Sequence, residues 1–188
     1  QSQKTLKFAA CNYNVSGSTY FDCMQLEKGG APNGYTLLQN GSFENGSANG
    51  WSSSYARGTA AHSGSYALKM QGSTESSLLC YQRNQLQRSG SDVRFVVSGW
   101  AKADSVALTG NRQFALRVSM DSETHIYPFN ADYTGWQYVS GTVVPETTLT
   151  IHYVDVDILY SYNCNTAYFD DITLTMEDVY QPSQEEKE

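Results

Sequence analysis

Five side chains in this sequence combine the chemistry that a sugar-binding site needs. Trp100 falls on the outward positions of a segment whose alternate positions are apolar. Arg117 and His152 hold outward positions in two other segments, Gln113 shares the segment of Arg117, and Tyr81 falls beside a loop where it can rim a site. Aromatic rings pack against the C–H faces of sugars, while guanidinium, imidazole and amide groups bind hydroxyls. If these segments are neighbouring strands, Trp100, Gln113, Arg117 and His152 share one concave face.

These aromatic residues also have simpler structural interpretations, which the sequence leaves open. In the alternative interpretation, Trp100 packs beneath a loop, because tryptophan is mostly buried in folded proteins. Tyr81 is then an ordinary surface tyrosine. Trp51 and Trp136 each follow a glycine at the entry to a strand, and we expect them to pack in the core or at the end of a sheet.

A catalytic site is not predicted. His62, His125 and His152 have no evident nucleophile partner, and no motif places a base beside a cysteine. Asp170 and Asp171 are adjacent on a strand, so their side chains point to opposite faces, whereas glycoside hydrolysis needs two carboxyl groups facing each other across a cleft. The chain is therefore expected not to be an enzyme.

The composition favours a neutral ligand. Only 16% of the residues are charged and 14 are tyrosine, which together indicate a polar, uncharged surface with aromatic patches. A net charge of -7 argues against nucleic acid, because phosphate binding depends on clustered Lys and Arg. No apolar run reaches membrane-spanning length. The four cysteines lack zinc-site spacing; disulfides and free thiols both stay open for Cys11, Cys23, Cys80 and Cys164.

Short alternating segments bounded by Gly, Asn, Ser or Pro predict an all-β protein. Within residues 93–102, Val93, Phe95 and Val97 face a core; within 113–120, Phe114 and its alternate neighbours do so. Leu149, Ile151 and Tyr153 are predicted to face the core in a third segment. Further strands are expected at residues 66–71, 77–82, 137–144 and 168–176. Many short strands separated by turn signals indicate a two-sheet antiparallel sandwich or barrel.

A short internal sequence repeat divides the chain. Residues 19–26 (TYFDCMQL) align with residues 167–174 (AYFDDITL). Residues 1–28 are therefore predicted to be the terminal strand pair of a preceding similar module, docked or exchanged onto a complete one. Residues 29–36 form a linker, 37–177 the complete module, and 178–188 a linker or tail. The alternative is that two strands of an all-β protein look alike by chance.

The order of several motifs resembles the jelly-roll carbohydrate-binding modules of families 4, 9 and 22, which are galactose-binding-like β-sandwiches. The motifs are LQNGSFENG with Trp51, HSGSYAL, SGWAK, GWQYVS and YFDDI, spread over residues 37–177. The WAKA and NTAYFDD variants also look like modules that stand in tandem in large bacterial surface or secreted proteins carrying RHS (YD) repeats. The resemblance implies an extracellular, non-catalytic module.

The resemblance also implies a structural calcium ion where the first strand approaches the last. Glu44 and Asp170 match the acidic ligands of the family, with carbonyl oxygens expected from Ser42 and from the turn at Ser63 to Ser65. Calcium takes six to eight oxygens, which carboxylates and turn carbonyls can supply. In the alternative, Glu44 and Asp170 cap turns by accepting hydrogen bonds from backbone amides.

Two functions follow from these observations. The first is a non-catalytic module that attaches a larger extracellular protein to polysaccharide or cell-surface glycan, with calcium holding the fold. The second is a structural or adhesion spacer, without a sugar site, in a surface or toxin-delivery protein. A groove lined by three or more exposed aromatic and hydrogen-bonding residues favours the first, whereas a flat face of Ser, Thr and Ala favours the second.

Overall fold

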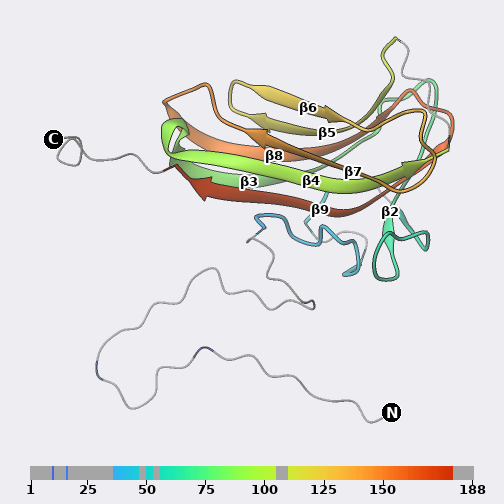
Figure 1. Ribbon diagram of the computed structural model, residues 1–188, viewed down its shortest axis with the longest axis horizontal. Coiled ribbons are helices and arrows are strands. Elements are labelled where there is room, and N and C mark those ends of the chain that lie inside the picture. Colours follow the sequence, from blue (N-terminus) through green and yellow to red (C-terminus); the bar gives the residue numbers. More distant parts are fainter. Residues whose placement is uncertain are drawn as a thin grey trace. The chain divides into compact units, whose positions relative to one another are not determined.

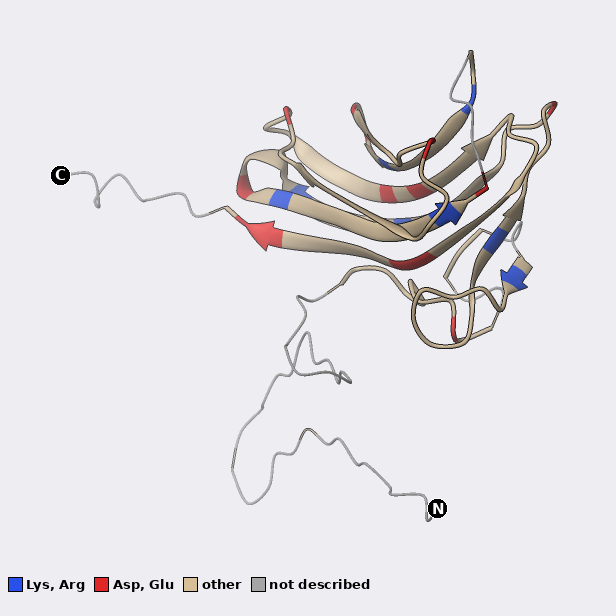
Figure 2. Cartoon of the chain, turned by 45° about the vertical axis from the view of Figure 1, so that its right-hand side comes forward, with Lys and Arg blue, Asp and Glu red and all other residues tan. Residues whose placement is uncertain are grey.

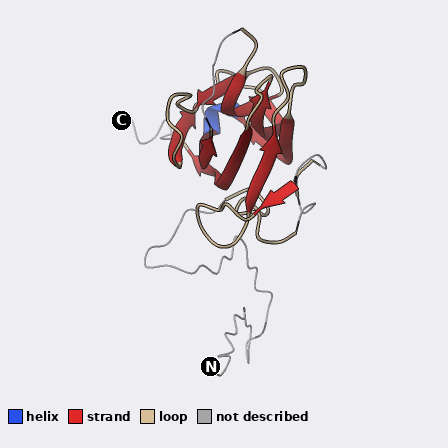
Figure 3. Ribbon diagram, turned by 90° about the vertical axis from the view of Figure 1, so that its right-hand side faces the viewer, coloured by secondary structure: helices blue, strands red, loops and turns tan. Residues whose placement is uncertain are grey.

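The chain folds into two antiparallel sheets packed face to face, as the sequence predicted (Figures 1 and 3). The computed structural model describes residues 10, 16, 36–46, 50–52, 56–104 and 110–179. The five-stranded sheet has the order β1 (Ala56–Gly58), β2 (Ala67–Gln71), β9 (Thr166–Asp178), β4 (Val93–Ala103) and β7 (Gln137–Val143). The four-stranded sheet has the order β3 (Leu79–Ser89), β8 (Thr150–Ser161), β5 (Gln113–Met120) and β6 (Thr124–Pro128). A 3-10 turn, Gly90–Asp92, joins β3 to β4.

Alternation of side chains along the strands builds the core between the sheets. In β4, Val93, Phe95 and Val97 are fully buried, while the residues between them face outward. In β5, Phe114 and Leu116 are buried on the same principle. The predicted inward and outward faces of both strands are thus confirmed.

The alternation predicted for residues 149–153 is wrong on both sides of Ile151. Ile151 is buried, but Leu149 is 75% exposed and Tyr153 lies half-buried beneath Arg83 on the outer surface. The pairing of β8 with β3 changes register here, and the alternation of β8 is out of phase on the two sides of that irregularity. Core positions beyond it are Val154, Val156 and Ile158.

The segment at residues 36–41 extends the five-stranded sheet beside β9. Leu37 donates its N–H to the carbonyl of Leu174 at 2.7 Å, and Ile172 donates to the carbonyl of Gly41 at 2.9 Å. A Cβ at Gly41 would lie 1.9 Å from the Ile172 carbonyl oxygen, so only glycine permits this approach. The segment continues into Phe43, which packs in the core.

Trp51 also packs in the core, as the sequence predicted. It is buried, its ring centroid lies 5.4 Å from that of Phe43, and its Nε1 donates to the Asn40 carbonyl at 3.2 Å. Cys80 is a buried free thiol and Cys164 an exposed one, so these two cysteines are not paired with each other.

Some expectations fall on residues outside the described ones. The strand pair at residues 1–28, its docking, and most of the linker at 29–36 are among them, and they stay predictions. Strand β9 ends at Asp178, and residues 180–188 of the expected tail are also outside the description. Among the described residues, no helix is long and apolar enough to cross a membrane.

Candidate functional site

A shallow groove lies on the outer face of the four-stranded sheet. The strands of both sheets bend in the same sense, so this outer face is the concave one (Figure 1). The groove has a volume of about 370 Å³, and side chains from β3, β8 and β5 line it. The lining residues are Leu79, Tyr81, Arg83, Arg117, Ser119, Asp155 and Asp157.

Strand register brings these residues together. Asp157 of β8 pairs with Tyr81 of β3 on one side and with Arg117 of β5 on the other. In the next row Asp155 pairs with Arg83 and with Ser119. Neighbouring strands lie about 4.8 Å apart, so each row holds its side chains within contact distance. Both aspartates lie on β8, between β3 and β5, and each is ion-paired with an arginine of one of these strands. Figure 2 shows acidic (red) and basic (blue) residues on neighbouring strands of the domain.

Arg83 is held from two sides. Its Nε and Nη2 donate to the two carboxylate oxygens of Asp155 at 2.8 and 2.7 Å, a bidentate pair. Its guanidinium carbon also lies 3.9 Å from the centroid of the Tyr153 ring. The hydrogen bonds that Arg83 donates to Asp155 raise the pKa of Arg83, which keeps the guanidinium charged. Arg83 is thus fixed in position at the rim of the groove.

Arg117 and Asp157 form the second ion pair, nearer the centre of the sheet. Arg117 Nε donates to Asp157 Oδ2 at 2.6 Å, and the Ser119 hydroxyl donates to the same oxygen at 3.2 Å. The Asp157 side chain is only 5% exposed. Burial raises the pKa of Asp157 above its ordinary value, and the bond from Arg117 opposes that rise.

The groove therefore offers polar groups in fixed positions beside exposed apolar surface. Carboxylates accept hydrogen bonds from hydroxyl groups, and guanidinium N–H groups donate to hydroxyl oxygens. Tyr81 is 41% exposed and supplies an aromatic ring at the edge. This combination of an aromatic ring with convergent donors and acceptors can bind a sugar.

Tyr81 and Arg117 are the two predicted ligand residues that line the groove. Gln113 lies farther along β5, where its carbonyl accepts from Asn163 Nδ2 at 2.8 Å and where it lines a separate polar depression of about 410 Å³ with Tyr162. His152 lies at the β8 irregularity, between Ile151 and Tyr153; its main-chain N–H and its Nδ1 contact Asp121 Oδ2 at 2.8 and 3.0 Å.

The expectation that Trp100 shares a face with Gln113, Arg117 and His152 is wrong. Strand β4 pairs with β7 and β9, so Trp100 faces outward from the five-stranded sheet, whereas the other three residues belong to the four-stranded one. The His62 ring stacks on Trp100, with centroids 3.8 Å apart and planes 13° apart. This contact matches the alternative in which a loop covers the tryptophan.

Tyr138 and Trp136 join the same outer cluster. The Tyr138 ring centroid lies 5.3 Å from that of Trp100, and the Trp136 ring meets His62 edge-on at 5.6 Å. Trp136 is half-buried in this cluster, directly before β7 begins at Gln137, so it packs at the end of a sheet rather than in the buried core, the second of the two expected positions. A ligand role for Trp100 stays a prediction, separate from the groove.

Three groove residues were not predicted from the sequence: Arg83, Asp155 and Asp157. The signal was present in the run from Val154 to Ile158, where two aspartates alternate with three apolar residues. That pattern places both carboxylates on the outer face of a strand. Finding their arginine partners requires knowing that β8 lies between β3 and β5, which the alternation itself does not reveal.

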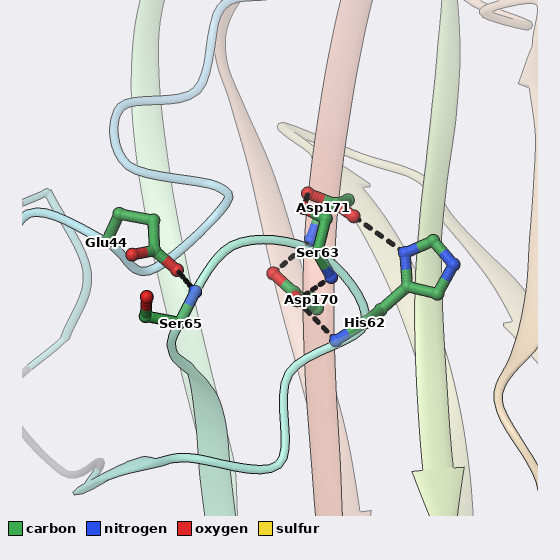
Figure 4. Close-up of polar contacts among 6 residues, drawn as sticks. All are labelled: Glu44, His62, Ser63, Ser65, Asp170 and Asp171. Carbon is green, nitrogen blue, oxygen red and sulfur yellow. Dashed lines mark hydrogen bonds and ion pairs between the residues drawn. The ribbon is translucent and has the colours of Figure 1, made fainter. Parts of the chain in front are cut away.

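Four of the five predicted metal ligands lie at the turn of residues 62–66: Glu44, Ser63, Ser65 and Asp170 (Figure 4). Asp170 is fully buried; its Oδ2 accepts from the main-chain N–H groups of His62 and Ser63 at 2.8 and 3.1 Å, and its Oδ1 accepts from that of Asp171 at 2.8 Å. Glu44 Oε1 accepts from the main-chain N–H of Ser65 at 2.8 Å, on the other side of the turn.

These contacts fit turn capping better than a calcium site. Both oxygens of Asp170 and one of Glu44 face N–H donors, whereas a cation needs oxygens turned toward it. Ser42 lies in a neighbouring turn, and the contacts of Ser63 and Ser65 to the two carboxylates are made through N–H groups. No group of three or more His, Cys, Asp or Glu arranged to hold a metal occurs in the described part of the chain. Calcium binding stays a prediction from the resemblance.

Asp170 has a further property in this setting. Burial raises its pKa to about 6, while the hydrogen bond from Ser63 lowers it and the neighbouring charge of Asp171 raises it. Asp171 has a positive φ of 50°, which turns its side chain toward His62; Asp171 Oδ2 lies 2.8 Å from His62 Nδ1. The two aspartates thus fasten the same turn to β9 from adjacent positions.

The chain is similar in sequence to the WapA proteins. No family model matches the chain. The chain is 30% identical over 168 residues to the tRNA nuclease WapA of Bacillus subtilis (strain 168), an alignment that covers 84% of this chain and 7% of WapA. Two further WapA proteins match over the same share, so the chain spans 7% of the length of these curated relatives.

Solved carbohydrate-binding modules have a similar β-sandwich fold. A family 16 module matches with a TM-score of 0.53 and 18% identity, covering 74% of this chain and 99% of the module. TmCBM61, solved in complex with β-1,4-galactotriose, matches with a TM-score of 0.53 and 18% identity, covering 76% and 99%. A cyclase from Fischerella sp. TAU matches with a TM-score of 0.54 and 12% identity, covering 78% and 98%. These similarities establish the sandwich fold, which carries more than one function.

Proposed function

We propose that this chain is a non-catalytic carbohydrate-binding module whose glycan lies in the groove on the outer face of the four-stranded sheet. The observation that carries the proposal is the set of groove residues: Tyr81 beside the Arg83–Asp155 and Arg117–Asp157 pairs. Three or more aromatic and hydrogen-bonding residues line one groove, which is the arrangement that favours sugar binding over a spacer role.

The outer face of the five-stranded sheet is a poorer candidate for a sugar site than the groove. Beyond the aromatic cluster at one end, its middle carries small hydroxyl side chains, with Ser98 and Thr173 hydrogen-bonded to each other at 2.7 Å and Ser140 bonded to the Val97 carbonyl at 3.2 Å. Such a face offers a ligand little shape and few free polar groups. The groove is therefore the better candidate for a binding site.

The module would attach a larger extracellular or cell-surface protein to polysaccharide or cell-surface glycan. The short share of the WapA proteins that the chain spans supports a place within a large multi-module protein. RHS repeats, tandem neighbours and an extracellular location belong to this proposal. A nuclease activity, if the complete protein has one, is assigned to other parts of it, because the groove has no phosphate-binding cluster of unpaired arginines.

The alternative function is a structural or adhesion spacer without a sugar site. The hydroxyl-rich middle of the outer face of the five-stranded sheet is the observation that favours it. In that case the charged groove pairs serve only to order the outer surface of the four-stranded sheet.

Affinity electrophoresis of the purified protein through gels containing galactan, xylan, β-glucan or mannan tests the proposal. We expect at least one glycan to retard the wild type and the Tyr81→Ala variant to lose that retardation. Tyr138→Ala is the matched control, because Tyr138 is an exposed tyrosine on the outer face of the other sheet. Folded protein that no glycan retards would support the spacer instead.

A further inference from the structure

Every arginine that lines the groove is already paired with an aspartate in the same groove. Arg83 and Asp155 form one pair, and Arg117 and Asp157 form the other. The charges of the four residues cancel, so the groove presents polar groups without a net charge. The chain as a whole carries a net charge of -7.

Asp155 and Asp157 already accept hydrogen bonds from the arginine N–H groups that an anionic sugar would need. Asp155 takes Nε and Nη2 of Arg83 at 2.8 and 2.7 Å, and Asp157 takes Nε of Arg117 at 2.6 Å. A uronate binds an arginine best through a bidentate edge. Asp155 fills that edge of Arg83, and Asp157 takes the Nε donor of one such edge of Arg117. An incoming carboxylate would therefore meet a carboxylate at each arginine.

Neither aspartate can easily swing aside to admit such a ligand. The side chains of Asp155 and Asp157 are only 10% and 5% exposed. Asp157 is further held by the hydroxyl of Ser119 at 3.2 Å. Moving a buried carboxylate away from its arginine would leave a charge without a partner, which is costly.

An uncharged hydroxyl group suits the same arrangement. A hydroxyl can donate its proton to a carboxylate oxygen and accept a bond from a guanidinium N–H that the ion pair does not use. Arg117 donates to Asp157 through Nε, and this hydrogen bond leaves the four N–H groups on its Nη atoms for other acceptors. A sugar with only hydroxyl groups can therefore satisfy both members of a pair together.

We propose that Asp155 and Asp157 are specificity-determining residues that restrict the groove to uncharged glycans and exclude uronates and other anionic sugars. This inference rests on the proposed function and goes beyond it by naming the class of glycan. Asp157 acts through Arg117 of the interior strand β5, and Asp155 acts through Arg83 of the edge strand β3.

Matched neutral and anionic polymers test the inference. Affinity gels would contain hydroxyethylcellulose or carboxymethylcellulose in one pair, and galactan or polygalacturonate in the other, together with the glycan that most retards the wild type. We expect the wild type to bind the neutral member of a pair at least about tenfold more tightly, because like charges brought together across an interface cost at least that much. Asp155→Asn and Asp157→Asn should reduce that ratio by freeing an arginine.

The outcomes separate the two proposals. Retardation by neutral polymers alone, with anionic binding gained in either asparagine variant, supports the inference. Equal binding of neutral and anionic members by the wild type overturns it while leaving sugar binding intact, and this comparison holds even if a variant fails to fold. Asparagine variants that fold, shown by an unchanged circular dichroism spectrum, and gain no anionic binding also overturn it. No binding to any polymer instead removes the proposed function itself.

Discussion

The imidazole ring of His62 lies flat on the indole ring of Trp100, with 3.8 Å between their centroids and 13° between their planes. His62 belongs to a turn and Trp100 to the interior strand β4, so the contact fastens the turn at residues 62–66 to the outer face of β4. The hydrogen bonds from His62 and Ser63 to Asp170 fasten the same turn to β9.

Replacing either ring should destabilise the turn without affecting the groove. We expect His62→Ala and Trp100→Ala each to lower the free energy of unfolding by about 1 kcal/mol beyond the loss of buried area, since a stacked aromatic pair contributes about that much. Urea unfolding measures this loss, and proteolysis within residues 59–66 should become faster. His152→Ala, an exposed histidine in the other sheet, is the control. Lost glycan retention with unchanged stability would make Trp100 a ligand platform.

Gly41 should tolerate no side chain. A Cβ there would lie 1.9 Å from the main-chain oxygen of Ile172, and a strand backbone cannot move as a flexible side chain can. We expect Gly41→Ala to lower the free energy of unfolding by at least about 2 kcal/mol, the range for overpacking. Gly46→Asn is a suitable control, because Gly46 has a positive φ of 83° that asparagine accepts and open space where a Cβ would be added. Equal stability of the two variants in urea would show that the segment yields.

Chelation separates turn capping from calcium binding at Asp170 and Glu44. The N–H contacts of both carboxylates lead us to expect that EDTA leaves Tm unchanged, whereas Asp170→Asn lowers the free energy of unfolding by about 1–3 kcal/mol because buried N–H donors lose their acceptor. Calorimetric melting with EDTA and with added calcium makes the comparison. A Tm that falls with chelator and recovers with calcium would instead establish the metal that the resemblance implies.

The stability loss of Arg117→Ala should grow as the pH rises. Burial raises the pKa of Asp157, and removing the Arg117 bond that opposes this raises it further. A carboxyl with a raised folded-state pKa holds its proton more tightly when folded, so its contribution is present below the unfolded pKa and is lost as the pH rises through the folded one. We expect a small deficit against wild type near pH 4 and about 3 kcal/mol at pH 7, as for a buried charge without its partner.

Urea unfolding at both pH values measures that deficit. In the Asp157→Asn background the Arg117→Ala substitution should give the same deficit at both, because no carboxyl is left to titrate at that position. If the loss of stability caused by Arg117→Ala in the wild-type background does not change with pH, the Arg117–Asp157 ion pair is not its cause.

The sequence predicted what a single strand determines about itself. The inward position of Phe95 and the outward positions of Trp100 and Arg117 follow from alternation along one strand, and all three are confirmed. Alternation does not say which strands are neighbours. Arg83 and Asp155 are 72 residues apart in the chain yet form a bidentate pair, and Trp100 and Arg117 lie on different sheets.

Local irregularities account for the remaining differences. The third predicted strand assumed an unbroken alternation through Leu149, Ile151 and Tyr153, and the register shift between β8 and β3 breaks it. Asp171 adopts a positive φ within β9, so two adjacent aspartates both serve one turn rather than pointing to opposite faces. Such irregularities depend on how strands meet, which a pattern of residue types does not encode.

The chain enters and leaves this domain at neighbouring points. Thr36 bridges Thr175 in antiparallel fashion, and β9 ends three residues later at Asp178. Tension applied through the flanking chain would therefore load the Thr36–Thr175 contact first and open the pairing one hydrogen bond at a time, as in unzipping, rather than shear many bonds together. Because the two ends are close together, the folded domain would contribute little to the end-to-end length of a protein under tension. Its unfolding would add the full length of the extended chain.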